Sequence, residues 1–165
     1  MGWRDSLGGS HIPVLVKMIQ QVNGAVLELG VGNNSTPLLH WLCAEKKVPL
    51  LSLENDKKWY EEFASFKTFN HRVEFVENWD HLHHLKVYDT RWSLVLVDNS
   101  PVRKRRVMAK RLRNHADFLL LHDAEPENDH KNGYTKIYDK FKHIYIYDKV
   151  WPFTAIVSKV KEIKL

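Results

Sequence analysis

The sequence contains a single cysteine and no long apolar run, and each absence excludes a class of protein. Cys43 alone cannot form an internal disulfide, which fits a reducing compartment. No segment approaches the roughly 20 apolar residues that cross a bilayer, and the first residues lack the apolar core of a secretory signal. We therefore expect a soluble, cytoplasmic protein with no membrane partner.

Internal repeats, low-complexity tracts and interdomain linkers are also missing from the 165 residues. A chain of this length supports one hydrophobic core and is too short for two ordinary domains. We expect a single domain over residues 1–165, with an N-terminal lid and helix in residues 1–22 and the core in residues 23–165. The net charge of +5 weakly favours anionic partners.

Short β-rich runs alternate with helical patterns along the chain. The expected strands are residues 25–29, 50–54, 73–77, 92–98, 118–123, 143–147 and 154–159. The expected helices are residues 10–22, 35–45, 57–67, 101–114 and 134–141. This alternation predicts a mostly parallel sheet covered by helices on both faces. No helix separates the last two strands, so they should pair as an antiparallel hairpin.

The most informative segment is the turn that follows the first expected strand. Glu28 ends an apolar run, and Gly30 and Gly32 follow it before the polar start of a helix. Glycine allows a tight turn and lets a ligand lie against the backbone. A dinucleotide fingerprint would place a third glycine where this chain has Ser35. A carboxylate at Glu28 would repel a pyrophosphate and attract an ammonium group, which disfavours NAD.

An acidic residue followed by x-Gly-x-Gly resembles the first motif of the class I S-adenosylmethionine-dependent methyltransferases. The likeness extends over about residues 10–160 as an order of elements. It implies the Rossmann-like α/β fold of that family, a three-layer αβα sandwich. Its seven-stranded, mostly parallel sheet has the order 3-2-1-4-5-7-6, with the seventh strand antiparallel. It also implies that S-adenosylmethionine is the cofactor.

The resemblance assigns each part of the cofactor to a strand end. The methionine carboxylate would lie near residues 33–36, its amino group near Glu28, the ribose on Glu54 and the adenine in the loop that contains Trp79. Two alternatives are that Glu54 is a solvated acid and that Trp79 packs under the next segment. The candidate cofactor-binding residues are Glu28, Gly30, Gly32, Asn34, Ser35, Thr36, Glu54, Asn78, Trp79, Asp80 and Asp98.

Asp98 follows the fourth expected strand, at the position where the family presents the methyl group to its acceptor. Amino-methylating members often have Pro-Pro and an aromatic after this position, whereas this chain has Ser100 and Val102. The difference favours an oxygen acceptor over a nucleobase nitrogen. Asp98 could orient the substrate, accept its proton or bind a cation. Alternatively, Asn99 or Ser100 caps the next helix, and Asp98 is merely buried and hydrogen-bonded.

A second group of polar residues follows the fifth expected strand. Asp123 and Asp98 come from adjacent strand ends and could share Mg²⁺, as in metal-dependent O-methyltransferases. Those enzymes have Asp-Asn where this chain has Asp123-Ala124, so Glu125 or His122 would have to replace the missing ligand. His122 could instead be a general base or a hydrogen-bonded structural residue. The candidate catalytic residues are Asp98, His122 and Asp123.

Residues 102–113 contain seven cations and no acid: Arg103, Lys104, Arg105, Arg106, Lys110, Arg111 and Arg113. A solvated basic face explains the second half of this helix. Four consecutive cations in its first turn, however, oppose the helix dipole. We therefore expect Arg103, Arg105 and Arg106 to hold an anionic substrate, with His11 contributing from a lid formed by residues 1–13 and 124–133.

These residues together predict a methyltransferase that acts on a small, anionic acceptor at oxygen. One alternative is a nucleic-acid-binding or RNA-modifying protein that uses the basic helix 102–113 on phosphates. A cofactor-binding domain without turnover is another. No zinc site is expected at His81, His83 and His84, because no cysteine or paired histidine accompanies them. The aromatic residues of segment 145–153 fit either hairpin packing or a homodimer surface.

Overall fold

The structure, a computed structural model, describes residues 9–165 and contains one seven-stranded sheet. The strands are β1 (Val26–Leu29), β2 (Leu50–Glu54), β3 (His71–Phe75), β4 (Trp92–Val97), β5 (Ala116–His122), β6 (His143–Tyr147) and β7 (Thr154–Ser158). Their order is β3-β2-β1-β4-β5-β7-β6. β7 runs antiparallel to both β5 and β6, and the other pairs are parallel. The predicted strand order and hairpin are confirmed.

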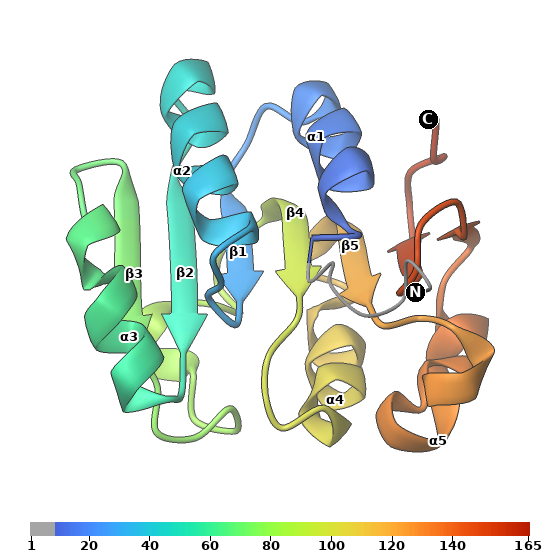
Figure 1. Cartoon of the computed structure of the whole chain (residues 1–165). Helices are drawn as coiled ribbons and strands as arrows, with labels where there is room; N and C mark the ends of the chain where they lie inside the picture. The colour runs from blue at the N-terminus through green and yellow to red at the C-terminus, as the bar shows by residue number, and fades with distance from the viewer. Residues whose placement is uncertain (1–8) are drawn as a thin grey trace, which may run out of the picture.

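α1 precedes β1, and the other helices lie between strands along the chain (Figure 1). The α-helices are α1 (Ile12–Gln21), α2 (Ser35–Lys46), α3 (Lys57–Phe63), α4 (Arg103–Leu112) and α5 (Asp129–Asn132). Short 3₁₀-helices span η1 (Ala64–Phe66), η2 (His83–Leu85), η3 (Pro126–Asn128) and η4 (Tyr134–Lys140). Within residues 9–165, none of the helices has both the length and the apolar character needed to span a bilayer.

The two faces of the sheet carry separate apolar cores. In β4, Leu94 and Leu96 belong to the cluster that includes α1 and α2, whereas Val95 and Val97 belong to the cluster that includes α4 and η4. Successive side chains of a strand point to opposite faces, so a strand covered on both sides must be apolar throughout. The apolar runs in the sequence therefore reflect a three-layer arrangement.

Several element boundaries differ from the sequence-based prediction. β3 begins at His71, two residues before the predicted start, because His71 is buried and pairs with Leu50. The predicted lid loop 124–133 contains η3 and α5, and the helix predicted over residues 134–141 is the 3₁₀-helix η4. Gly133, with a φ of +65°, ends α5 between them. The part of the predicted lid in residues 1–8 lies outside the described residues.

A buried polar network joins the first three strands beneath the turn after β1. Glu28 is fully buried and accepts hydrogen bonds from Thr36 Oγ1 at 3.0 Å and Ser52 Oγ at 2.5 Å. Thr36 Oγ1 in turn accepts from the backbone N–H of Gly32. Ser52 Oγ also lies 2.9 Å from His71 Nε2. When Glu28 is ionised, the single proton of Ser52 goes to Glu28, so His71 is the donor in that last contact.

Burial raises the pKa of Glu28 from its usual 4.5 to about 7, against the opposing effect of its hydrogen bonds. The folded state therefore holds a proton on Glu28 that the unfolded state has released between pH 4.5 and 7. Stability must fall as the pH rises through this window. A difference of 2.5 pKa units (7 minus 4.5) corresponds to about 3 kcal/mol.

We expect the variant Glu28→Gln to lack this pH dependence. The free energy of unfolding of the wild type minus that of the variant should decrease from pH 4.5 to 7 and then level off, as measured by urea denaturation. Burial lowers the pKa of His71 to about 4, which acts in the opposite direction but largely cancels in the difference. The exposed Glu62→Gln is the matched control. A pH-independent difference for Glu28→Gln would contradict the expectation.

Candidate active site

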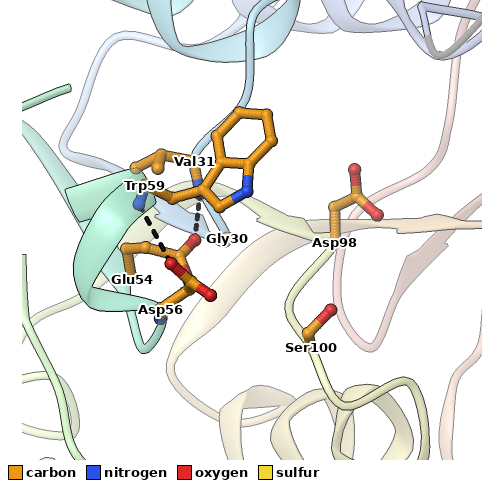
Figure 2. A pocket seen from close by; sticks show the side chains of 7 residues that line it. All are labelled: Gly30, Val31, Glu54, Asp56, Trp59, Asp98 and Ser100. Carbon is orange, nitrogen blue, oxygen red and sulfur yellow. Dashed lines mark hydrogen bonds between the residues drawn. The ribbon is translucent and has the colours of Figure 1, made fainter. Parts of the chain in front are cut away.

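A cavity of about 270 Å³ opens at the edge of the sheet where β1, β2 and β4 end. Its lining residues are Gly30, Val31, Glu54, Asp56, Trp59, Asp98 and Ser100. Figure 2 shows Trp59 and Glu54 on one side of this cavity and Asp98 on the other. Open α/β sheets bind their ligands at this edge, beside the first strand. Three predicted site residues, Gly30, Glu54 and Asp98, thus lie around one space.

The backbone conformation and close packing at the floor of the cavity require glycine at position 30. Its φ is +87°, and a Cβ there would lie 2.7 Å from the carbonyl oxygen of Asp98. Gly32 is different, since a Cβ at that position would meet only Ser35 Oγ, at 3.8 Å. The first glycine therefore allows β1 and β4 to approach each other. The second leaves open space above the turn, where a ligand could approach the backbone.

Glu54 is held firmly at the cavity wall. Its Oε2 accepts from Val31 N at 2.9 Å, and its Oε1 accepts from Asn55 N at 2.8 Å and Asp56 N at 2.7 Å. These three bonds occupy most of the roughly four acceptor positions of a carboxylate. Glu54 thus links the glycine turn to the start of α3 and keeps limited capacity for a ribose hydroxyl.

The remaining residues predicted to bind the cofactor lie beneath or beside the cavity. Ser35 and Thr36 are buried, and Thr36 hydrogen-bonds to Glu28, so Thr36 and Glu28 support the glycine turn from below. Asn34 is an exposed residue at the start of α2. Asn78 lines a separate cavity of about 370 Å³ after β3. The predicted contacts of these side chains with the cofactor stay predictions.

Trp79 and Asp80 do not present free groups to an adenine. The Trp79 ring is buried in the core, and its Nε1 donates to the carbonyl oxygen of Ser100 at 2.6 Å. Asp80 pairs with Lys104 at 2.5 Å and Arg111 at 2.8 Å, and these cations lower its pKa. Trp79 therefore packs under the loop after β4, which is the alternative that the sequence had left open.

Trp59 is an aromatic residue of the site that sequence reasoning missed. It lies in the first turn of α3, lines the cavity and is 39% exposed. Asp56 caps this turn by accepting from Trp59 N at 3.1 Å. The sequence feature that could have identified Trp59 is its position, as an aromatic residue five residues after Glu54. Trp59, rather than Trp79, presents a ring to the cavity.

Arg105 is the buried centre of the charged groups behind the cavity. Its guanidinium lies 2.8 Å from Asp98 Oδ1 and 2.6 Å from Asp123 Oδ2, and its Nε donates to the carbonyl oxygen of Asn99. Only 6% of Arg105 is exposed. The prediction that Arg105 holds an anionic substrate is therefore wrong, because two carboxylates of the protein already occupy it. Neither Asn99 nor Ser100 caps α4 with its side chain.

The same contacts argue against magnesium between Asp98 and Asp123. Both carboxylates already share a cation, and Mg²⁺ requires near-octahedral oxygen coordination. Ala124 offers no side-chain ligand. Glu125 is buried and accepts from Phe153 N at 3.0 Å, which holds the start of η3 against the segment before β7. The residues present do not fit a magnesium ion.

The basic first turn of α4 is balanced by acids from three different loops. Lys104 pairs with Asp80, and Arg105 pairs with Asp98 and Asp123. Arg103 is exposed, and Arg106 lies against Gly133. Tertiary ion pairs thus offset the opposition between cations and helix dipole. Arg103 and Arg106 remain as candidates for an anionic ligand.

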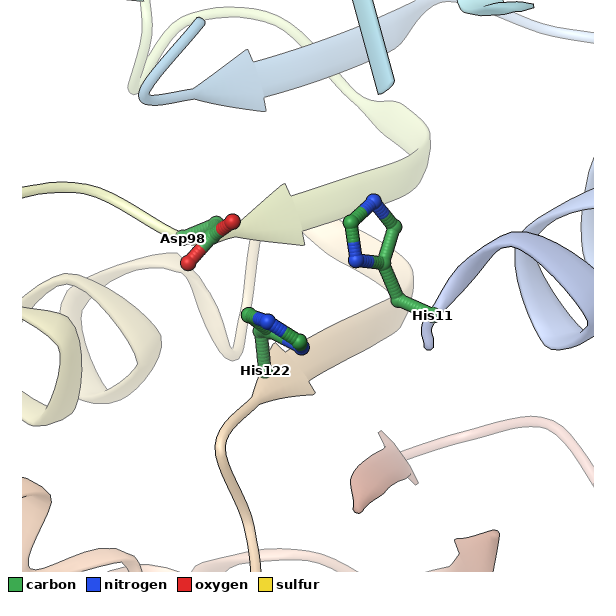
Figure 3. A group of neighbouring side chains, drawn as sticks. All are labelled: His11, Asp98 and His122. Carbon is green, nitrogen blue, oxygen red and sulfur yellow. The ribbon is translucent and has the colours of Figure 1, made fainter. Parts of the chain in front are cut away.

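His11 and His122 lie beside Asp98, and Figure 3 shows the three side chains grouped together. The imidazole centroids are 4.7 Å apart, and the residues are 2% and 6% exposed. Burial lowers the pKa of His11 to about 4 and also lowers that of His122, so both rings are neutral near pH 7. Burial raises the pKa of Asp98 to about 6, against the effect of Arg105.

We expect Arg105→Met to destabilise the protein by about 1–3 kcal/mol, because it leaves the half-buried carboxylates of Asp98 and Asp123 without the cation that they share. Urea denaturation at pH 7.5 measures the loss. Arg103→Gln on the same helix is the control and should change stability by no more than about 0.5 kcal/mol. Equal changes in the free energy of unfolding for the two variants would show that the ion pairs of Arg105 do not contribute to stability.

No protein-family model and no curated protein matches the sequence, but solved structures match the fold. SAH-bound methyltransferase PaMTH1 of Podospora anserina is 10% identical, with a TM-score of 0.67 over 94% of this chain and 80% of that one. Human methyltransferase-like protein 13, solved with SAH, is 12% identical, with a TM-score of 0.63 over 88% and 75%. M. capricolum TrmK, solved with S-adenosyl-homocysteine, is 11% identical, with a TM-score of 0.59 over 92% and 70%.

At these identities the likeness concerns the fold, and it agrees with the strand order and with the cavity at the ends of β1, β2 and β4. The expectation drawn from the glycine turn and the order of elements is confirmed at this level. The chain has the fold of the class I S-adenosylmethionine-dependent methyltransferases.

Proposed function

We propose that the protein is an S-adenosylmethionine-dependent methyltransferase that acts on a small, anionic acceptor at oxygen. One observation carries the proposal: a glycine turn, a fixed acid and an aromatic ring surround a single cavity at the strand ends of a methyltransferase fold. Several structural neighbours were solved with SAH, the product of such a reaction. Their ligand supports the choice of cofactor.

The cavity suggests a position for each part of the cofactor. Trp59 and Glu54 would hold the nucleoside, by stacking and by accepting from a ribose hydroxyl. The methionine end would lie over the turn at Gly30 and the start of α2. The methyl group would then point toward Asp98, which faces Trp59 across the cavity (Figure 2).

Methyl transfer is a displacement at carbon, so the protein mainly has to align the acceptor and help to remove its proton. Asp98 lines the cavity and can accept a hydrogen bond from an acceptor hydroxyl, while His122 lies buried beside Asp98. Arg103 is exposed at the start of α4 and can hold a carboxylate or phosphate of the same molecule. This combination favours a hydroxylated, anionic acceptor.

Calorimetric titration tests the cofactor. We expect S-adenosylmethionine and S-adenosylhomocysteine to bind with 1:1 stoichiometry. Trp59→Ala should weaken binding by roughly 10- to 100-fold, the effect of removing a base-stacking aromatic. Trp41→Ala is the matched control, because Trp41 is 68% exposed on α2 and should leave affinity unchanged. Binding of NAD or ATP in place of these ligands would refute the assignment.

A basic surface on α4 supports a second candidate function, the binding of nucleic acid. Arg106, Lys110, Arg111 and Arg113 line a hollow of about 380 Å³ on the surface of α4, and such a basic surface can bind nucleic acid phosphates. In that case the acceptor would be part of an RNA or DNA. The basic surface extends away from the first turn of α4, where a small acceptor would be held.

Substitutions on α4 separate the two candidates. For a small acceptor, Arg103→Gln should raise the KM for hydroxylated carboxylates and phosphates at least fivefold in a methyl-transfer assay, with SAH affinity unchanged. The double variant Lys110→Gln, Arg113→Gln should have no effect on that KM. For a nucleic acid, the double variant should weaken RNA binding and reduce its salt dependence. Weaker and less salt-dependent RNA binding by the double variant would favour a nucleic-acid acceptor and refute the small-molecule proposal.

A further inference from the structure

We propose that His11, Asp98 and His122 form a binding site for a divalent first-row transition metal such as Zn²⁺ or Co²⁺. The three side chains each offer a ligand atom, and these atoms all lie within 4.8 Å of one another. They come from the residue that precedes α1, the end of β4 and the end of β5. Figure 3 shows them directed toward one shared space.

The strongest sign of a ligand is the absence of hydrogen-bond partners for the imidazoles. Nδ1 and Nε2 of His11 and Nδ1 of His122 are buried and find no partner among residues 9–165. His11 and His122 are 98% and 94% buried, from exposures of 2% and 6%. A buried polar atom left without a partner costs about 1–3 kcal/mol, so three such atoms in contacting rings require an explanation. A metal ion in the shared space would bind one nitrogen of each ring, so it would account for one atom of His11 and for at most two of these three atoms.

The donor set selects the kind of metal. Imidazole nitrogens suit Zn²⁺, Co²⁺, Ni²⁺ and Fe²⁺, whereas Mg²⁺ prefers oxygen ligands only. Two histidines and one carboxylate also match the three protein ligands of catalytic zinc sites, which keep a position open for water or substrate. The ligand set thus differs from the Asp98 and Asp123 pair, which Arg105 already bridges.

The surrounding charges support a dication at this position. Asp98 uses one oxygen, Oδ1, for Arg105, and no residue within 9–165 is seen to donate to its other oxygen. The ion pair therefore orients the carboxylate in the way that outer hydrogen bonds orient metal ligands. Asp123 adds a second negative charge beside His122, with Oδ1 at 3.5 Å from Nε2. Two carboxylates and one guanidinium leave a net charge of −1 for the metal to neutralise.

This inference rests on the proposed function where it concerns chemistry. A metal at the open position would bind the acceptor hydroxyl and lower its pKa. The hydroxyl proton would pass to water, an O–CH₃ bond would form as the S–CH₃ bond breaks, and the electron pair would stay on sulfur. Such a metal would explain a preference for oxygen over a nucleobase nitrogen.

Cobalt titration tests the site directly. Protein without a polyhistidine tag, treated with a chelator, should bind one Co²⁺ per chain and develop visible absorption from nitrogen coordination. His11→Ala and His122→Ala should each weaken Co²⁺ binding at least tenfold. The matched control is the double variant His83→Ala, His84→Ala, which removes two exposed histidines and should keep the wild-type affinity. Circular dichroism checks that each variant folds, and His11→Gln and His122→Gln replace any that does not.

Three results would overturn the metal site: no Co²⁺ binding by the wild type, unchanged affinity in both single variants, or loss of binding in the control alone. Calorimetry with S-adenosylhomocysteine on the same samples separates this inference from the proposed function. Tight SAH binding without Co²⁺ binding would refute only the metal site. Co²⁺ binding that depends on His11 and His122, without SAH binding, would refute only the methyltransferase.

Discussion

The site depends on one buried cation, Arg105, which neutralises two carboxylates that come from the ends of different strands. Asp98 and Asp123 follow β4 and β5, and their half-buried carboxylates repel each other less because both contact the same guanidinium. Because Arg105 belongs to the first turn of α4, the ion pairs also position that helix. The cavity wall at Asp98 and the place of His122 beside it both follow from this arrangement.

A second polar layer lies on the other side of the cavity, under the glycine turn. Glu28, Thr36 and Ser52 hold the turn from below, while Glu54 holds it from the side through Val31 N. The acid of the sequence motif thus acts as a buried support for the loop. The groups that line the cavity are backbone at Gly30 and the side chains brought by β2, α3 and β4.

The strand order could be predicted because its signals are local. The strands at residues 50–54 and 143–147 have the predicted limits, and the apolar runs reflect burial on two faces. That Gly30, Glu54 and Asp98 lie around one cavity could also be predicted, because the ends of parallel strands meet at one edge. Trp59 was missed, and Arg105 was assigned to the substrate, because their partners lie in other loops. Nothing in the local pattern of α4 distinguishes Arg105 from Arg103.

The sequence by itself determined the order of the strands, the glycine turn and the edge of the sheet at which a ligand would bind. These features depend on backbone conformation and on the period of apolar residues, both of which are properties of neighbouring positions. Only the tertiary structure decided which polar side chains are already bound by other protein groups and which can contact a ligand. Whether a polar residue forms an ion pair, supports a loop or lines the cavity depends on distances between segments that are far apart in the chain. His11 and His122 are an example, because they are 111 positions apart and their rings are in contact.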